Sequence, residues 1–112
     1  MRAGDLYLVD FGQPVRGVEQ ANVRPALVIH SESYLRIPNL ALVCPITRVA
    51  RGVPNHVPLP PSRDAGLRDE SFVMTEQIRA VDRRFVGEHL GAAPVDVTNT
   101  VLRIIRDRLI AR

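Results

Sequence analysis

The sequence predicts a mainly β protein with one α-helix, built as a small, strongly bent antiparallel sheet or barrel that ends in the helix. Short apolar runs rich in valine, leucine and isoleucine alternate with proline- and glycine-containing segments along most of the chain. A pattern with helical spacing occurs only after residue 94. The length of 112 residues and the hydrophobic fraction of 46% suit one domain, residues 1–112, with one core.

Six segments are expected to form strands, because they are apolar and are bounded by turn-forming residues. They are residues 6–11, 25–29, 40–47, 56–59, 71–81 and 85–91. Pro45 has no N–H group to donate to a strand ladder, so it should mark an edge or a bulge. The run 71–81 is long enough for one bent strand or for two, and both possibilities stay open.

The last segment is expected to be an amphipathic helix that starts near Pro94, a residue that suits the first helical position. Its apolar residues recur at spacings of three and four. They are Val97, Val101, Ile104, Ile105 and Leu109. Asp96 near the start and arginines near the end suit the helix dipole.

Composition excludes several classes of protein. No apolar run approaches the roughly 18 residues of a membrane span, and Asp5 interrupts the N-terminal region, so no signal peptide is expected. The single cysteine, Cys44, cannot form an intramolecular disulfide and fits a reducing, cytoplasmic location. Because His30, His56 and His89 are far apart in sequence, we expect neither a zinc site nor another metal or cofactor.

The net charge is +3, and all 15 basic residues are arginine. One interpretation is a GC-rich genome, whose codons favour arginine. The other is phosphate recognition, because a guanidinium group offers a planar fork of hydrogen-bond donors. The two interpretations are compatible, and a charge of +3 by itself only hints at nucleic acid.

Arg24 stands out because it comes directly before the predicted strand 25–29. A residue that precedes proline is pushed into an extended conformation, and here that proline is Pro25. The sequence therefore places a cation on a rigid element at the rim of the core, where a binding site would need it. The alternative is an ordinary solvated arginine at a strand end.

Four segments decide between these interpretations. They are "GDLYLVDFG" at 4–12, "EQANVRPALVI" at 19–29, "CPIT" at 44–47 and "EQIRAVDRR" at 76–84. Together and in this order they resemble the MazF/PemK/Kid family of toxin endoribonucleases. The resemblance extends from Gly4 to the terminal helix, and its strength comes from four motifs in register.

This resemblance implies an SH3-like barrel of the MazF/CcdB type, a homodimer, and metal-independent, sequence-specific cleavage of single-stranded mRNA as part of a type II toxin–antitoxin system. The 2′-hydroxyl would attack, leaving a 2′,3′-cyclic phosphate and a 5′-hydroxyl. The implied partner is an antitoxin with an acidic, disordered tail that fills the RNA groove.

The resemblance also assigns residues. The catalytic arginine falls on Arg24, the phosphate-binding threonine on Thr47 and the acid of the last motif on Glu76. Substrate-binding positions fall on Glu19, Gln20, Gln77 and Arg79. Arg24 is a poor proton acceptor because its pKa exceeds about 12, so its expected role is electrostatic.

The general base stays open. Glu76 is one candidate, and a structural ion pair with Arg79 or Arg24 is the alternative interpretation of this residue. Glu19 is a second candidate base, although loop ordering or base recognition is favoured for it.

Two departures from the family pattern exclude side chains that some members of the family use. Some members have a catalytic histidine where this chain has Val18, and some have an arginine where it has Met74. The chain should therefore depend on Arg24 and Thr47. Two other functions remain: a CcdB-like toxin that binds DNA gyrase without chemistry, and an RNA-binding module that has lost catalysis.

Overall fold

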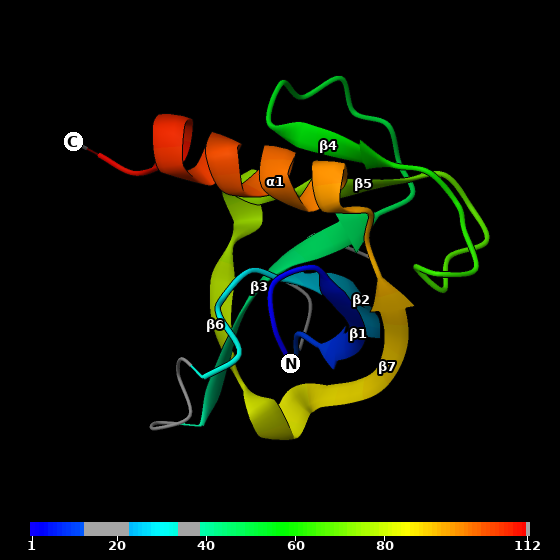
Figure 1. Ribbon diagram of the computed structural model, residues 1–112, viewed down its shortest axis with the longest axis vertical. Helices are drawn as coiled ribbons and strands as arrows, with labels where there is room; N and C mark the ends of the chain where they lie inside the picture. Colours follow the sequence, from blue (N-terminus) through cyan, green and yellow to red (C-terminus); the bar gives the residue numbers. More distant parts are fainter. Residues whose placement is uncertain (13–22, 34–38, 112) are drawn as a thin grey trace.

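The computed structural model describes residues 1–12, 23–33 and 39–111. These residues form seven strands and one α-helix (Figure 1). The strands are β1 (Asp5–Asp10), β2 (Val23–Val28), β3 (Leu40–Thr47), β4 (His56–Leu59), β5 (Ser71–Met74), β6 (Arg79–Asp82) and β7 (Val86–Ala92). The helix α1 spans Val95–Ile104 and continues as a π-helical turn, Ile105–Leu109. The expected mainly β fold with a terminal helix is confirmed.

The strands form one antiparallel sheet in the order β4-β5-β3-β2-β1-β7, with β6 pairing to β3. The eight-residue strand β3 holds this arrangement together because it changes partners along its length. Its first half pairs with β6, and Ile46 and Thr47 at its end pair with β5. Pro45 lies between these two stretches, where the missing N–H group disrupts neither pairing. At the position where an edge or a bulge was expected, β3 therefore changes its strand partner.

The sequence was compatible with either one bent strand or two strands in residues 71–81. The structure has two, because this segment contains β5 and the start of β6. A single 3₁₀ turn, Thr75–Gln77, separates the two strands. The fully buried Thr75 anchors this turn, because its Oγ1 donates a 2.6 Å hydrogen bond to the carbonyl oxygen of Asn55. The turn lets β5 and β6 pair with different halves of β3.

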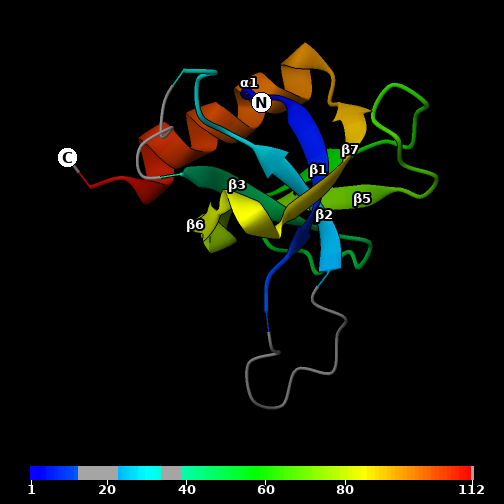
Figure 2. The same cartoon turned by 90° about the horizontal axis from the view of Figure 1, so that it is seen from below.

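The helix covers one face of the β3-β5-β4 region (Figures 1 and 2). Its buried residues Val97, Val101 and Ile104 join a core cluster with Leu27 of β2 and Val73 of β5. The periodic positions identified in the sequence therefore face the core. Pro94 precedes the helix as its cap residue, one position before the place expected for it, and its carbonyl accepts the hydrogen bond from the N–H of Thr98.

A second cluster lies on the opposite face of β2 and β3, around Val9, Ala26, Val28, Val43 and Val81. This face alternates with the first along each strand, as the two-residue period of a strand requires. Two residues of the candidate site lie at strand ends: Arg24 near the start of β2 and Thr47 at the end of β3.

Candidate functional site

Arg24 and Thr47 lie on adjacent antiparallel strands. The register of β2 and β3 pairs Ala26 with Pro45 and Leu27 with Cys44. Arg24 lies two residues before this paired stretch on β2, and Thr47 lies two residues after it on β3, where it pairs with Phe72 of β5. Both residues line the same cavity, which has a volume of about 540 Å³. The structure thus brings together the two residues on which the predicted chemistry depends.

The environment of Arg24 suits a fixed cation. The residue is half-buried at the start of β2, and burial lowers the pKa of its guanidinium below the ordinary value, with the positive charge of Arg51 lowering it further. An arginine still holds its proton at neutral pH under such conditions. A partly desolvated charge interacts more strongly with an anion than a fully solvated one does.

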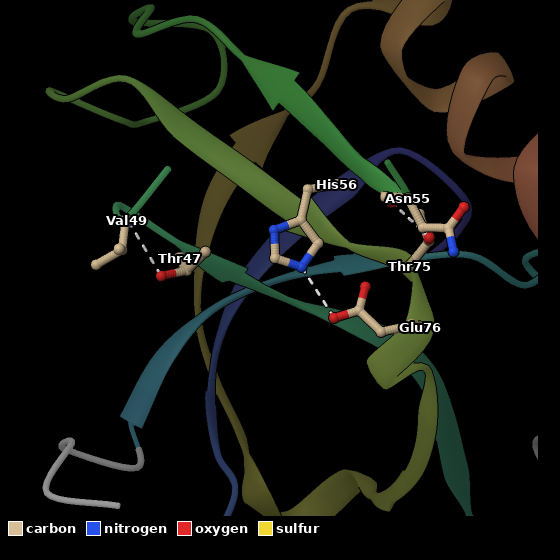
Figure 3. Close-up of polar contacts among 6 residues, drawn as sticks. All are labelled: Thr47, Val49, Asn55, His56, Thr75 and Glu76. Carbon is tan, nitrogen blue, oxygen red and sulfur yellow. Dashed lines mark hydrogen bonds and ion pairs between the residues drawn. The ribbon is translucent and has the colours of Figure 1, made fainter. Parts of the chain in front are cut away.

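The hydroxyl of Thr47 is held in one orientation. Its Oγ1 accepts a 3.2 Å hydrogen bond from the N–H of Val49, and the residue is only 6% exposed. Because that bond uses a lone pair of the oxygen, the hydroxyl proton can be donated to an oxygen atom of a ligand in the cavity. The Val49 contact is visible on the left of Figure 3.

Further arginines surround the cavity. Arg48 and Arg68 line it together with Arg24, and Asp69 is the one acidic residue among the described residues of the lining. Asp69 accepts a hydrogen bond from Arg48 at 3.2 Å, with both side chains well exposed. The site therefore has an excess of positive charge, as a site for polyanions requires.

Glu76 lies outside the lining of this cavity, in the turn between β5 and β6. Its Oε2 is 2.9 Å from Nε2 of His56, so its hydrogen-bond partner is this histidine, and not Arg79 or Arg24 as the alternative interpretation proposed (Figure 3). The pair lies on the same sheet face as Thr47, because Thr47 and His56 are paired with Phe72 and Met74, two residues apart on β5.

His56 was considered in the sequence as a metal ligand, and no metal site was expected from it. It begins β4, and its side chain is only 4% exposed. Its Nδ1 is also buried, with no hydrogen-bond partner among the described residues. The sequence offered no signal for the contact with Glu76, because the two residues are 20 positions apart and meet only through the β4–β5 pairing.

None of the remaining predicted positions that the structure describes lines this cavity. Gln77 is exposed in the 3₁₀ turn, and the Arg79 guanidinium stacks over the ring of Phe11 at 5.4 Å. Glu19 and Gln20 lie outside the described residues. The structure accordingly places Arg24 and Thr47 at one cavity and Glu76, Gln77 and Arg79 beyond it.

Cys44 is fully buried in the core. Burial raises the pKa of its thiol to about 12, and the negative charge of Glu76 contributes to the increase. The thiol therefore stays protonated at neutral pH and is unsuited to act as a nucleophile.

The described residues contain no cluster of three or more histidine, cysteine, aspartate or glutamate side chains that could hold a metal ion. Within the same described part of the chain, no helix is long and apolar enough to cross a membrane.

Comparison with known proteins identifies the family to which the chain is similar. Residues 2–109 match the family model described as PemK-like, MazF-like toxin of type II toxin–antitoxin system. The chain is 33% identical to endoribonuclease EndoA of Bacillus subtilis over 109 residues, which cover 93% of this chain and 92% of the relative. It is 35% identical to endoribonuclease MazF of Staphylococcus saprophyticus over 92 residues, 80% of this chain and 75% of the relative.

Solved structures show the same fold. MazF from Deinococcus radiodurans superposes with a TM-score of 0.80 at 34% identity, covering 97% of this chain and 96% of that one. A MazE–MazF structure from the same organism gives a TM-score of 0.78 at 33% identity, with 97% and 95% covered. The chain belongs to the PemK-like, MazF-like family of endoribonuclease toxins of type II toxin–antitoxin systems.

Proposed function

We propose that the protein is a metal-independent, sequence-specific endoribonuclease that cleaves single-stranded mRNA by attack of the 2′-hydroxyl on the adjacent phosphodiester. The products would be a 2′,3′-cyclic phosphate and a 5′-hydroxyl. The observation that carries the proposal is the presence of Arg24 and Thr47, from adjacent strands, in the lining of one cavity.

In this mechanism Arg24 stabilises the negative charge that develops on the non-bridging oxygens as phosphorus becomes five-coordinate. A planar guanidinium can bind two phosphate oxygens at once, and it keeps its charge throughout the reaction. Thr47 donates its hydroxyl proton to one of these oxygens while Val49 holds the hydroxyl in place. Such preorganised donors stabilise a transition state without reorganising during the reaction.

We assign Glu76 the role of accepting the proton of the 2′-hydroxyl, with His56 holding its carboxylate. The shared sheet face supports this assignment, because it places Glu76 on the side of the sheet that carries Thr47. Replacing Glu76 with Gln should lower the single-turnover rate by about 10²-fold or more. An unchanged rate would remove Glu76 from the reaction and leave the roles of Arg24 and Thr47 intact.

The proposed partner is an antitoxin whose acidic, disordered tail covers the arginines of the cavity. The excess of positive charge from Arg24, Arg48 and Arg68 supports this, since an acidic peptide and RNA then compete for the same surface. A solved structure of MazE–MazF from Deinococcus radiodurans, whose MazF fold is similar to this chain, supports a protein partner of this kind. We further propose that the toxin acts in the cytoplasm as a homodimer.

The test is to incubate the purified protein with mixed RNA in EDTA and to analyse the new ends. We expect fragments with 2′,3′-cyclic phosphate and 5′-hydroxyl ends, and no fragments from RNA that carries 2′-deoxyribose at the cleaved position. Fragments with 5′-phosphate ends would contradict the mechanism. Gyrase-dependent DNA breaks without RNA cleavage would identify a CcdB-like function instead.

A further inference from the structure

The cavity beside Arg24 and Thr47 has more apolar surface than a phosphate site needs. Five of its lining residues are apolar: Val23, Pro25, Ile46, Val49 and Leu67. A phosphodiester group requires charge and hydrogen-bond donors, and it gains nothing from contact with aliphatic side chains. The flat face of a nucleobase does gain from such contact, so the composition of the wall fits a whole nucleotide.

Part of the cavity wall comes from the turn-rich segment between β4 and β5. Gly66, Leu67, Arg68 and Asp69 form it, followed by Ser71 at the start of β5. The cavity volume of about 540 Å³ lies within the range of ligand sites that hold a small organic molecule.

This wall is rigid before any ligand arrives. Leu67 exchanges two backbone hydrogen bonds of 3.1 Å with Ser62, and the Ser62 hydroxyl accepts a 3.1 Å bond from the N–H of Ala65. The turn is also held against β7, since the N–H of Ala92 donates to the carbonyl oxygen of Asp64 at 2.7 Å. A site that distinguishes ligands of similar shape needs walls fixed in this way.

The same wall carries groups that can recognise the edge of a base. The Asp69 carboxylate and the Arg48 guanidinium, 3.2 Å apart, present an acceptor and donors side by side. An unpaired base in single-stranded RNA exposes its Watson–Crick edge, where amino and imino groups donate to a carboxylate and carbonyl oxygens accept from arginine. Because both side chains are well exposed, they can contact a base without disrupting the core.

We propose that this cavity is a base-recognition subsite: it holds the nucleobase next to the phosphate bound by Arg24 and Thr47, with Leu67 against its face and Asp69 selecting its identity. The inference rests on the proposed ribonuclease function and adds the segment 66–69 to the determinants of the cleavage sequence. Arg48 and Arg68 lie beside this nucleotide, where they can neutralise its flanking phosphates.

The first test is the cleavage profile of a randomised RNA pool, read by sequencing the 5′-hydroxyl ends. Asp69→Asn changes a pure acceptor into a mixed donor and acceptor, so base frequencies at one position beside the cut should change by about fivefold or more. Leu67→Ala should weaken the preference at the same position. Glu70→Gln is the matched control, because Glu70 is the adjacent exposed acid and does not line the cavity; its profile should equal that of the unmodified protein.

Active Asp69→Asn and Leu67→Ala variants with unchanged profiles would overturn the proposal, and so would a change spread evenly over all positions. Both results are distinct from failure of the ribonuclease function, in which the unmodified protein would cleave no RNA at all.

A second test measures binding without cleavage. A short RNA with 2′-deoxyribose at the cleaved position should shift the methyl resonances of Ile46 and Leu67 through the ring current of the bound base, whereas inorganic polyphosphate should not. Equal shifts with polyphosphate would show a site for phosphate alone and would contradict base recognition. Shifts with an antitoxin peptide and none with the oligonucleotide would assign the cavity to the antitoxin instead.

Discussion

The Nε2 atom of His56 lies 2.9 Å from Oε2 of Glu76, and the imidazole that makes this contact is almost completely buried. The contact joins the start of β4 to the turn that separates β5 from β6. Breaking it would cost about the net contribution of one hydrogen bond, because water can solvate the exposed Glu76 carboxylate.

His56→Leu should therefore lower the free energy of unfolding by about 0.5–1.5 kcal/mol, measured by urea denaturation. His56→Gln is the control, because its side-chain amide can still donate to Glu76, and we expect it to recover at least half of the loss. Equal destabilisation by both variants would show that ring packing, and not the hydrogen bond, stabilises this region.

Cys44 should be unreactive in the folded protein. Since burial raises the pKa of its thiol to about 12, the reactive thiolate is scarce below that pH. At pH 8 we expect a thiol-specific reagent to label the native protein far more slowly than the guanidinium-unfolded chain, which should take up one label for its single cysteine. Rapid labelling of the native protein would show that the core around β3 opens readily.

Gly66→Ala should destabilise the wall of the cavity. Gly66 has a φ of +71°, and an added Cβ would overlap the carbonyl oxygen of Leu90. We expect a loss of at least about 2 kcal/mol in unfolding free energy. Gly52→Ala is the matched control: its φ is +65°, but open space surrounds it, so only the backbone strain of about 1 kcal/mol should appear. Equal losses would show that the turn can move away from β7.

Arg48 should contribute to RNA binding, whereas its ion pair with Asp69 should contribute little to the stability of the fold. The side chains are 76% and 61% exposed, and exposed pairs contribute roughly 0–1 kcal/mol. Arg48→Gln should leave the unfolding free energy within about 0.5 kcal/mol of its original value. It should also weaken RNA binding and reduce the slope of log K against log salt by about 1.

Arg103→Gln is the control for this variant, because Arg103 is exposed on α1 and does not line the cavity. Both variants remove one positive charge from the protein. If the location of the charge matters and the net charge does not, the slope of log K against log salt for Arg103→Gln should equal that of the unmodified protein. Identical slopes for the two variants would contradict a specific role for Arg48.

The sequence was most informative where a local pattern determines structure. Val97, Val101 and Ile104 follow the period of a helix and do face the core. Arg24 and Thr47 were placed at strand ends, and both residues line one cavity in the structure. The exposed positions of Arg103, Arg106 and Arg108 likewise agree with the expected solvated face of the helix.

The sequence was least informative where side chains meet across long separations. Asp69 contacts Arg48 from 21 residues away, and no periodicity in the turn-rich segment 60–70 predicts that it forms a wall of the cavity. Nothing in the sequence around His56 indicated that its side chain is buried either, because that burial depends on the pairing of β4 with β5. Such contacts follow from the topology of the sheet, which one sequence specifies only indirectly.

The central claim is that Arg24 and Thr47 act together on one phosphodiester. A double-mutant cycle tests it: single-turnover cleavage rates in EDTA for Arg24→Ala, Thr47→Ala and the double variant. Each single variant should lose about 10²-fold or more, and the double variant should lose clearly less than the product of the two losses, because both groups stabilise the same transition state. Fully multiplicative losses, or an Arg24→Ala rate equal to that of the unmodified protein, would contradict the claim.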